Sequence, residues 1–213
     1  EQLEALSQWW QEKRTSVIAV VVLTLGGTIG WSQYEDYTDQ KAVAAANSYD
    51  SLLQGRESGE SAEEMALISA GLRETHDGGA FAAFASLQVA AAAVEAGDLV
   101  LARDELESVM ATIELDSTLG QLVQLRLARV MAASGDEATA VAILEQGSSS
   151  FPASYAQALG DIHLAAGRES EALMAYQSAQ TESLALGGQL GLVDLKVSGL
   201  SLRDAEDSIE DSQ

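Results

Sequence analysis

GDLVLARDEL at residues 97–106, GDEATAVAIL at residues 135–144 and GRESEALMAY at residues 167–176 follow one pattern. Each stretch begins with glycine, has alanine five residues later and ends on a large apolar residue. Upstream of each glycine, a small residue lies seven positions away and a larger apolar residue eight positions away. The aligned residues are Gly97, Gly135 and Gly167; Ala102, Ala140 and Ala172; Leu106, Leu144 and Tyr176; Ala90, Ala128 and Gly160; Val89, Leu127 and Leu159. Three copies, 38 and 32 residues apart, indicate a repeat.

Each repeat is interpreted as a pair of helices, in which the glycine ends one helix and precedes the next. Small residues at a fixed position suit a helix crossing, where larger neighbours fill the groove beside them. The composition agrees, because 47% of the residues are hydrophobic, 5% are aromatic and only one is proline. The sequence therefore predicts an all-α domain, with Ala185–Leu200 as its last, capping helix.

The repeat resembles the tetratricopeptide repeat, whose period is about 34 residues. Pro152 falls at the end of the second unit, where that family favours a helix-stopping proline. The aromatic residue usual near the start of a unit is absent, and Ser86, Gln124 and Ala156 stand there instead. The resemblance implies an α-solenoid of stacked helix pairs, while the missing aromatics leave its superhelical geometry open.

A further helix pair is predicted before the repeats. Apolar residues at helical spacing indicate a first helix over 34–53, which Gln54–Gly59 is expected to end. Ser61 and Glu64 have the spacing of a capping box, which opens a second helix. That helix is expected to end at the turn His76–Gly79.

Residues Thr15–Trp31 (TSVIAVVVLTLGGTIGW) contain no charged side chain. As a helix they would extend roughly 26 Å, which nearly matches a hydrocarbon core of about 30 Å. We interpret them as a transmembrane helix; a cleaved secretory signal and a buried core helix are the alternatives. Gly26 and Gly30 are spaced to let a second membrane helix approach closely.

The charges around this span predict its orientation. Lys13 and Arg14 precede it, whereas Glu35, Asp36 and Asp39 follow it, which places the N-terminus in the cytoplasm. The predicted organisation is a cytoplasmic segment (1–14), the membrane helix (15–31), a periplasmic repeat domain (32–202) and an acidic, disordered tail (203–213).

The chain is strongly acidic, with a net charge of −22. Such a surface repels nucleic acid. It is consistent with a solvated surface suited to solubility or with a preference for basic partners, and charge alone does not separate these readings. The chain has no cysteine, so it contains neither disulfides nor thiolate sites.

The order of these features resembles the YfgM family of ancillary Sec translocon subunits. Lys13–Arg14, the exit of the span at Gly30–Trp31 and the segment Leu125–Val130 (LRLARV) carry the resemblance. It implies an inner-membrane protein with a periplasmic tetratricopeptide-like domain. The resemblance further implies association with SecYEG and a PpiD-like periplasmic chaperone, and assistance to secreted client proteins as they leave the channel. A structural tether or regulator, and a repeat adaptor in another envelope complex, remain alternative functions.

Residues for catalysis or metal binding are sparse. His76 is expected in a turn and His163 as a packing residue. Asp161 and His163 are two positions apart, so a helix would point them to different sides, and no third metal ligand is evident. The pair Gly187–Gly188 lacks the lysine of a phosphate-binding loop. We therefore expect a protein-binding scaffold without catalytic, metal or cofactor sites.

A helical solenoid offers a concave face lined by the first helix of each pair. Apolar side chains with one cation on that face would suit an extended or helical peptide. The alternative is that these residues only cover the core or meet the final helix. By repeat register the predicted face comprises Phe84, Leu87, Val94, Leu122, Leu125, Arg129, Gln157 and Asp161.

Overall fold

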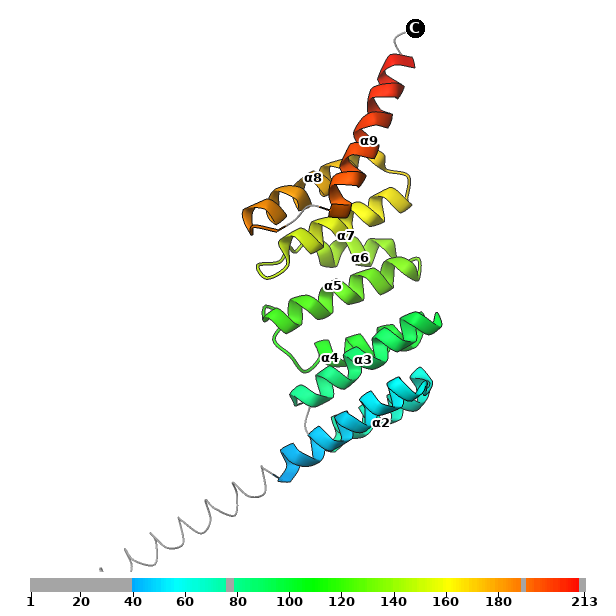
Figure 1. Ribbon diagram of the computed structural model, residues 1–213, viewed down its shortest axis with the longest axis vertical. Coiled ribbons are helices and arrows are strands. Elements are labelled where there is room, and N and C mark those ends of the chain that lie inside the picture. The colour runs from blue at the N-terminus through cyan, green and yellow to red at the C-terminus, as the bar shows by residue number, and fades with distance from the viewer. Residues whose placement is uncertain (1–39, 76–78, 189–190, 211–213) are drawn as a thin grey trace, which may run out of the picture.

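The computed structural model describes residues 40–75, 79–188 and 191–210, and these residues form helices and turns with no strand. The helices are stacked in chain order along the long axis of the molecule, from a helix over residues 40–58 to α9 at the opposite end (Figure 1). Their bounds are α2 Ala62–Thr75, α3 Ala80–Ala96, α4 Leu99–Met110, α5 Thr118–Ala133, α6 Glu137–Leu144, α7 Pro152–Ala165, α8 Glu169–Ala185 and α9 Gly191–Glu210.

The predicted repeats are confirmed as helix pairs. Helices α3 and α4, α5 and α6, and α7 and α8 pack against each other, and α5 also contacts α4 and α7 of the neighbouring pairs. Helix α2 packs on α3, and α9 covers α8. Adjacent pairs therefore bury one another, as in an α-solenoid.

The repeated glycines end the first helix of each pair. Gly97 has a φ of +81°, a conformation that suits a residue without Cβ. The amide of Asp98 donates to the carbonyl oxygen of Ala93 at 2.8 Å, which closes the end of α3. The Asp98 carboxylate then accepts a hydrogen bond from the Leu101 amide at 3.0 Å and caps α4. The Gly-Asp dipeptide thus ends one helix and begins the next.

The small residues of the repeat lie at the helix crossings. An added Cβ at Gly160 would lie 2.6 Å from the ring of Tyr176, so α7 approaches α8 at this point as closely as glycine allows. Ala90 and Ala128, which occupy the same register position, are 3% and 0% exposed. The sequence interpretation of this position as a crossing is confirmed.

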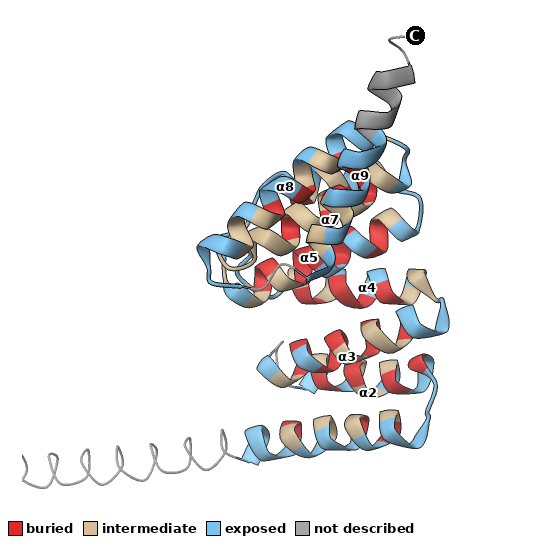
Figure 2. Cartoon of the chain, turned by 45° about the horizontal axis from the view of Figure 1, so that its top comes forward, coloured by how far each residue is buried: buried red, intermediate tan, exposed pale blue. Residues whose placement is uncertain are grey.

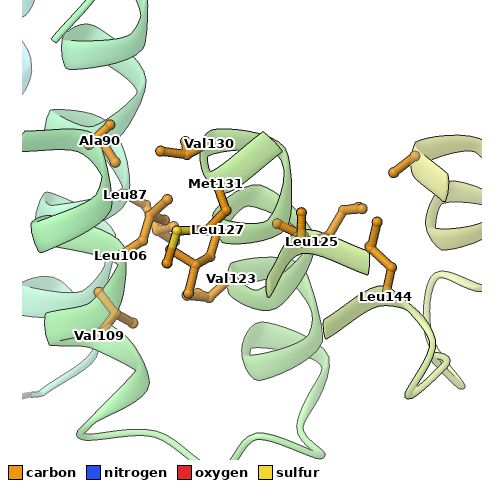
Figure 3. Close-up of a cluster of buried hydrophobic side chains, with 14 of the residues drawn as sticks. Leu87, Ala90, Leu106, Val109, Val123, Leu125, Leu127, Val130, Met131 and Leu144 are labelled. Carbon is orange, nitrogen blue, oxygen red and sulfur yellow. The ribbon is translucent and has the colours of Figure 1, made fainter. Parts of the chain in front are cut away.

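The core consists of three apolar clusters, the largest of which includes residues of α3, α4, α5, α6 and α7. Buried residues recur on helices along the whole stack (Figure 2). Apolar side chains of α3 and α4 face apolar side chains of α5 in its largest cluster (Figure 3). Leu125 lies on the other side of α5, toward Leu144 of α6. The side facing α3 and α4 comprises Val123, Leu127, Val130 and Met131.

Replacement of Ala128 by leucine is expected to lower the free energy of unfolding by about 1–3 kcal/mol, because the fully buried crossing has no room for three more carbons. Urea unfolding of the detergent-solubilised chain, followed by circular dichroism, measures this. Ala138→Leu on the exposed face of α6 is the matched control and should change stability by less than about 0.5 kcal/mol. Equal stability of the two variants would contradict the assigned register.

The capping box before the repeats is confirmed. The Glu64 carboxylate accepts from the Ser61 amide at 3.0 Å, and the Ser61 hydroxyl accepts from the Glu64 amide at 3.3 Å. The predicted break at Gln54–Gly59 is wrong for most of its length, because the helix continues to residue 58. It ends at Gly59, which has a φ of +82°.

Two other predicted boundaries need correction. Pro152 does not stop a helix but begins α7, where its missing amide hydrogen costs nothing. The last helix starts at Gly191 rather than Ala185, because α8 extends to Ala185. It also continues to Glu210, so residues 203–210, expected to be a disordered tail, are helical.

Within residues 40–75, 79–188 and 191–210, every helix is too short or too polar to cross a membrane. The predicted membrane helix, Thr15–Trp31, lies outside the described residues, as do Gly26 and Gly30. The turn at His76 lies outside them as well.

Candidate protein-binding groove

Two adjoining hollows form a groove across three helix pairs. The first, of about 350 Å³, lies between α3, α4 and α5, and the second, of about 250 Å³, lies between α5 and α7. Arg129 and Ala133 line both hollows, so the two hollows adjoin at α5. The remaining lining residues are Ala90, Ala91, Val94, Glu95, Leu99, Leu106, Arg126, Val130, Ala132, Ala158, Asp161, Ile162 and Ala165.

The repeat register explains why the surface is hollow here. Residues two and six positions before each glycine line the groove, as do the residues three positions before Gly97 and Gly135, and many of them are alanine. Ala91, Ala132, Ala133 and Ala165 are too small to fill the space between neighbouring first helices. The alanine-rich composition therefore produces an apolar groove, which is the usual form of a peptide-binding site on helices.

Arg126 and Arg129 are exposed at this groove. Within the described residues, neither side chain makes an ion pair or a hydrogen bond. The other five described arginines each lie beside a carboxylate: Arg56, Arg73, Arg103, Arg168 and Arg203. The two unpaired arginines thus meet at one surface of an acidic protein.

The two carboxylates in the groove already have partners. Glu95 accepts from the Arg56 guanidinium at 2.9 Å. Asp161 accepts from the Tyr176 hydroxyl at 2.6 Å and from the ammonium group of Lys196 in α9. Burial raises the pKa of Tyr176 and the Asp161 carboxylate raises it further, so the phenol stays protonated and donates at neutral pH. Neither carboxylate neutralises the unpaired arginines.

The predicted concave face agrees with this groove only in part. Val94, Arg129 and Asp161 line the groove, and Asp161 also meets the final helix, as the alternative interpretation anticipated. The expected exposure of Leu87 and Leu125 is wrong, because they are 6% and 4% exposed and fill the core between pairs.

The other three predicted residues lie away from the groove lining. Phe84 is 43% exposed, but its ring centroid lies 6.5 Å from that of Tyr49. Leu122 and Gln157 are half-buried. Sequence reasoning missed Arg126, whose signal was its place in the segment Leu125–Val130, three residues before Arg129.

A second apolar surface lies on α9. Leu192, Leu195 and Leu202 are 64%, 71% and 67% exposed, at a spacing that places them along one side of the helix. The sequence analysis treated this helix only as a cap and did not anticipate the exposed leucines.

His163 is engaged in a structural contact. The Arg168 guanidinium donates to its Nδ1 at 3.0 Å and also pairs with Glu137 of α6. This contact joins α6 to the end of α7. In the part of the chain that the structure describes, no group of three or more histidine, aspartate and glutamate side chains could hold a metal ion.

Residues 7–201 match the family model described as a tetratricopeptide repeat-like domain. The chain is 28% identical to the ancillary SecYEG translocon subunit of Haemophilus influenzae, over 92% of this chain and 95% of the relative. It is 30% identical to the protein of the same name from Aggregatibacter actinomycetemcomitans, over 89% and 92% of the two chains. No solved structure matches the chain.

Proposed function

Because the chain belongs to the YfgM family of ancillary SecYEG translocon subunits, as its sequence predicted, we propose that it acts at this translocon as a protein-binding scaffold. The observation that carries the proposal is the extent of the similarity, which covers nearly the full length of both chains. It therefore includes the predicted membrane segment together with the repeats.

In this proposal Thr15–Trp31 anchors the chain in the inner membrane, with residues 1–14 in the cytoplasm and the repeat domain in the periplasm. The positive charges before the span and the negative charges after it support this orientation. The anchor, with Gly26 and Gly30, packs beside the membrane helices of SecYEG.

The repeat domain acts by binding rather than by catalysis. The groove over α3, α5 and α7 supplies an apolar surface of the kind that holds a peptide segment, with Val94, Arg126 and Arg129 exposed along it. A PpiD-like periplasmic chaperone and translocating clients are its proposed partners. By holding them beside the exit of the channel, the scaffold raises their local concentration there.

Purification of the tagged chain from membranes in mild detergent is expected to recover SecYEG together with a PpiD-like chaperone. A photo-crosslinking residue at Ala133, which is exposed in the groove, should then join the chain to a partner in intact cells. The matched control is Ala138 on the exposed side of α6, where we expect little crosslinking. Recovery of a different envelope complex without SecYEG would overturn the proposal, and equal crosslinking at both positions would exclude the groove as the binding surface.

A further inference from the structure

Arg126 and Arg129 have no carboxylate partner among the residues that the structure describes, which is unexpected in a chain with 33 acidic and only 11 basic residues. With carboxylates in threefold excess, an arginine on this surface readily finds one nearby, as the other described arginines do. Arg126 and Arg129 lie three residues apart on α5 and therefore project from the same side of the helix. Both lie at the first hollow, beside apolar side chains.

We propose that this groove binds an acidic peptide segment that also carries apolar side chains. Carboxylates of the peptide pair with Arg126 and Arg129, and an adjacent apolar side chain enters the hollow lined by Val94, Leu99 and Val130. The inference deepens the proposed function by naming the chemistry of the segment that the scaffold binds, and it rests on that function for the use of the groove as a protein-binding site.

Local charge favours this occupant over a basic one. A net charge of −22 attracts basic peptides to the molecule as a whole. At physiological ionic strength, however, screening limits interactions between exposed charges to about 8 Å, so a bound peptide responds mainly to the nearest groups. At the first hollow those groups are two unpaired guanidiniums and Glu95, which Arg56 neutralises.

The apolar lining argues against other anionic ligands. A free phosphate or a nucleic-acid backbone would use the arginines but would leave the hollow unfilled, and the acidic surface repels nucleic acid at a distance. Val94, at 46% exposure, and the neighbouring alanines present an apolar surface that only a ligand with apolar groups covers.

The test is selection of phage-displayed random peptides of about 12 residues on the immobilised, detergent-solubilised full chain. Selected peptides are expected to be enriched in aspartate or glutamate close to leucine, isoleucine, valine or phenylalanine. A selection that yields basic peptides, peptides without acidic enrichment, or no enriched peptides would overturn the inference.

The most enriched acidic peptide, synthesised and labelled, should bind at least tenfold more weakly to the R126E/R129E variant and should lose affinity for R126Q/R129Q as well. The control is R103E/R203E, which changes the net charge equally on exposed arginines outside the groove and should bind within about twofold of the parent chain. Equal weakening in R126E/R129E and R103E/R203E would show that only overall charge matters and would refute the site. Circular dichroism melting checks that all variants are folded.

Copurification and peptide selection together separate this inference from the proposed function. If the parent chain copurifies with SecYEG but selects no acidic peptide, the scaffold role stands and the inference fails. If the chain selects acidic peptides through Arg126 and Arg129 but never recovers SecYEG, the peptide site stands and the assignment to the translocon fails.

Discussion

Replacement of Arg73 by methionine is expected to lower the free energy of unfolding by about 3–5 kcal/mol, because it leaves a buried carboxylate without its cation. The Glu105 side chain is only 5% exposed. Arg73 donates to its two oxygens at 2.6 and 3.2 Å and also to the hydroxyls of Ser69 and Ser86 at 2.9 and 2.7 Å. The network connects α2, α3 and α4, so its loss should loosen the first half of the solenoid.

Urea unfolding of the detergent-solubilised chain measures the loss. The double variant R73M/E105M should recover most of it, because replacing both members of a buried ion pair by apolar residues leaves no uncompensated charge. Arg103→Met is the matched control, since Arg103 forms an exposed pair with Glu107 on the same helix as Glu105 and should cost less than about 1 kcal/mol. If Arg73→Met were no more destabilising than Arg103→Met, the buried pair would have no special role.

The network also explains why the first repeat lacks the family's usual aromatic residue. Ser86 occupies that position and is 0% exposed, and its hydroxyl takes part in the hydrogen bonds around Glu105. Gln124, at the same position in the second repeat, donates to the carbonyl oxygen of Leu115 at 3.0 Å. In these two repeats, polar bonding replaces aromatic packing at the start of the unit.

The helix pairs were predictable because their determinants are local. A glycine with positive φ, a capping aspartate one residue later in the first two repeats and small residues at the crossings all act within a few turns of the chain, so their spacing appears directly in the sequence. The helix boundary near Gly55 was not predictable in this way. Gly55 stays inside a helix although glycine has a low helix propensity. Burial of Leu52, which is 0% exposed, stabilises the helix by more than Gly55 destabilises it.

Long-range polar contacts could not be predicted from spacing. Gln121 is 7% exposed, and its side-chain oxygen accepts from the Ser148 hydroxyl at 2.6 Å and the Ser150 amide at 2.8 Å. The Tyr155 hydroxyl donates to the backbone carbonyl oxygen of Gln121 at 2.7 Å. These partners lie 27, 29 and 34 residues from Gln121, on the loop after α6 and in α7, so a single sequence does not identify them.

The candidate groove was predicted only in outline for a related reason. Repeat register placed the predicted face on the first helices, and three of its residues, Val94, Arg129 and Asp161, line the groove, which Leu99 and Leu106 of α4 line as well. It could not separate the side of α5 that faces the groove from the side that faces α6. That separation depends on how far one pair is rotated on the next, which the sequence pattern does not specify.

Leu125 was predicted on the concave face but lies on the side of α5 that faces α6. Its replacement by alanine is expected to lower the free energy of unfolding by about 2–5 kcal/mol. The side chain is 4% exposed and packs in the core on the side of α5 toward Leu144, so the smaller residue leaves a cavity (Figure 3). Leu67→Ala on α2 is the matched control, because Leu67 is 75% exposed and the same truncation there should cost less than about 0.5 kcal/mol.

The same argument decides which substitutions can report on binding. Serine at Leu122 and Leu125 together would weaken the core before it altered any surface, so a loss of partner binding in that variant would reflect unfolding. Exposed Arg126 and Arg129 can be changed without a cavity and therefore test the groove itself. Urea unfolding of Leu125→Ala beside Leu67→Ala measures the difference; if the two variants were equally stable, Leu125 would be a surface residue after all and the predicted concave face would extend over it.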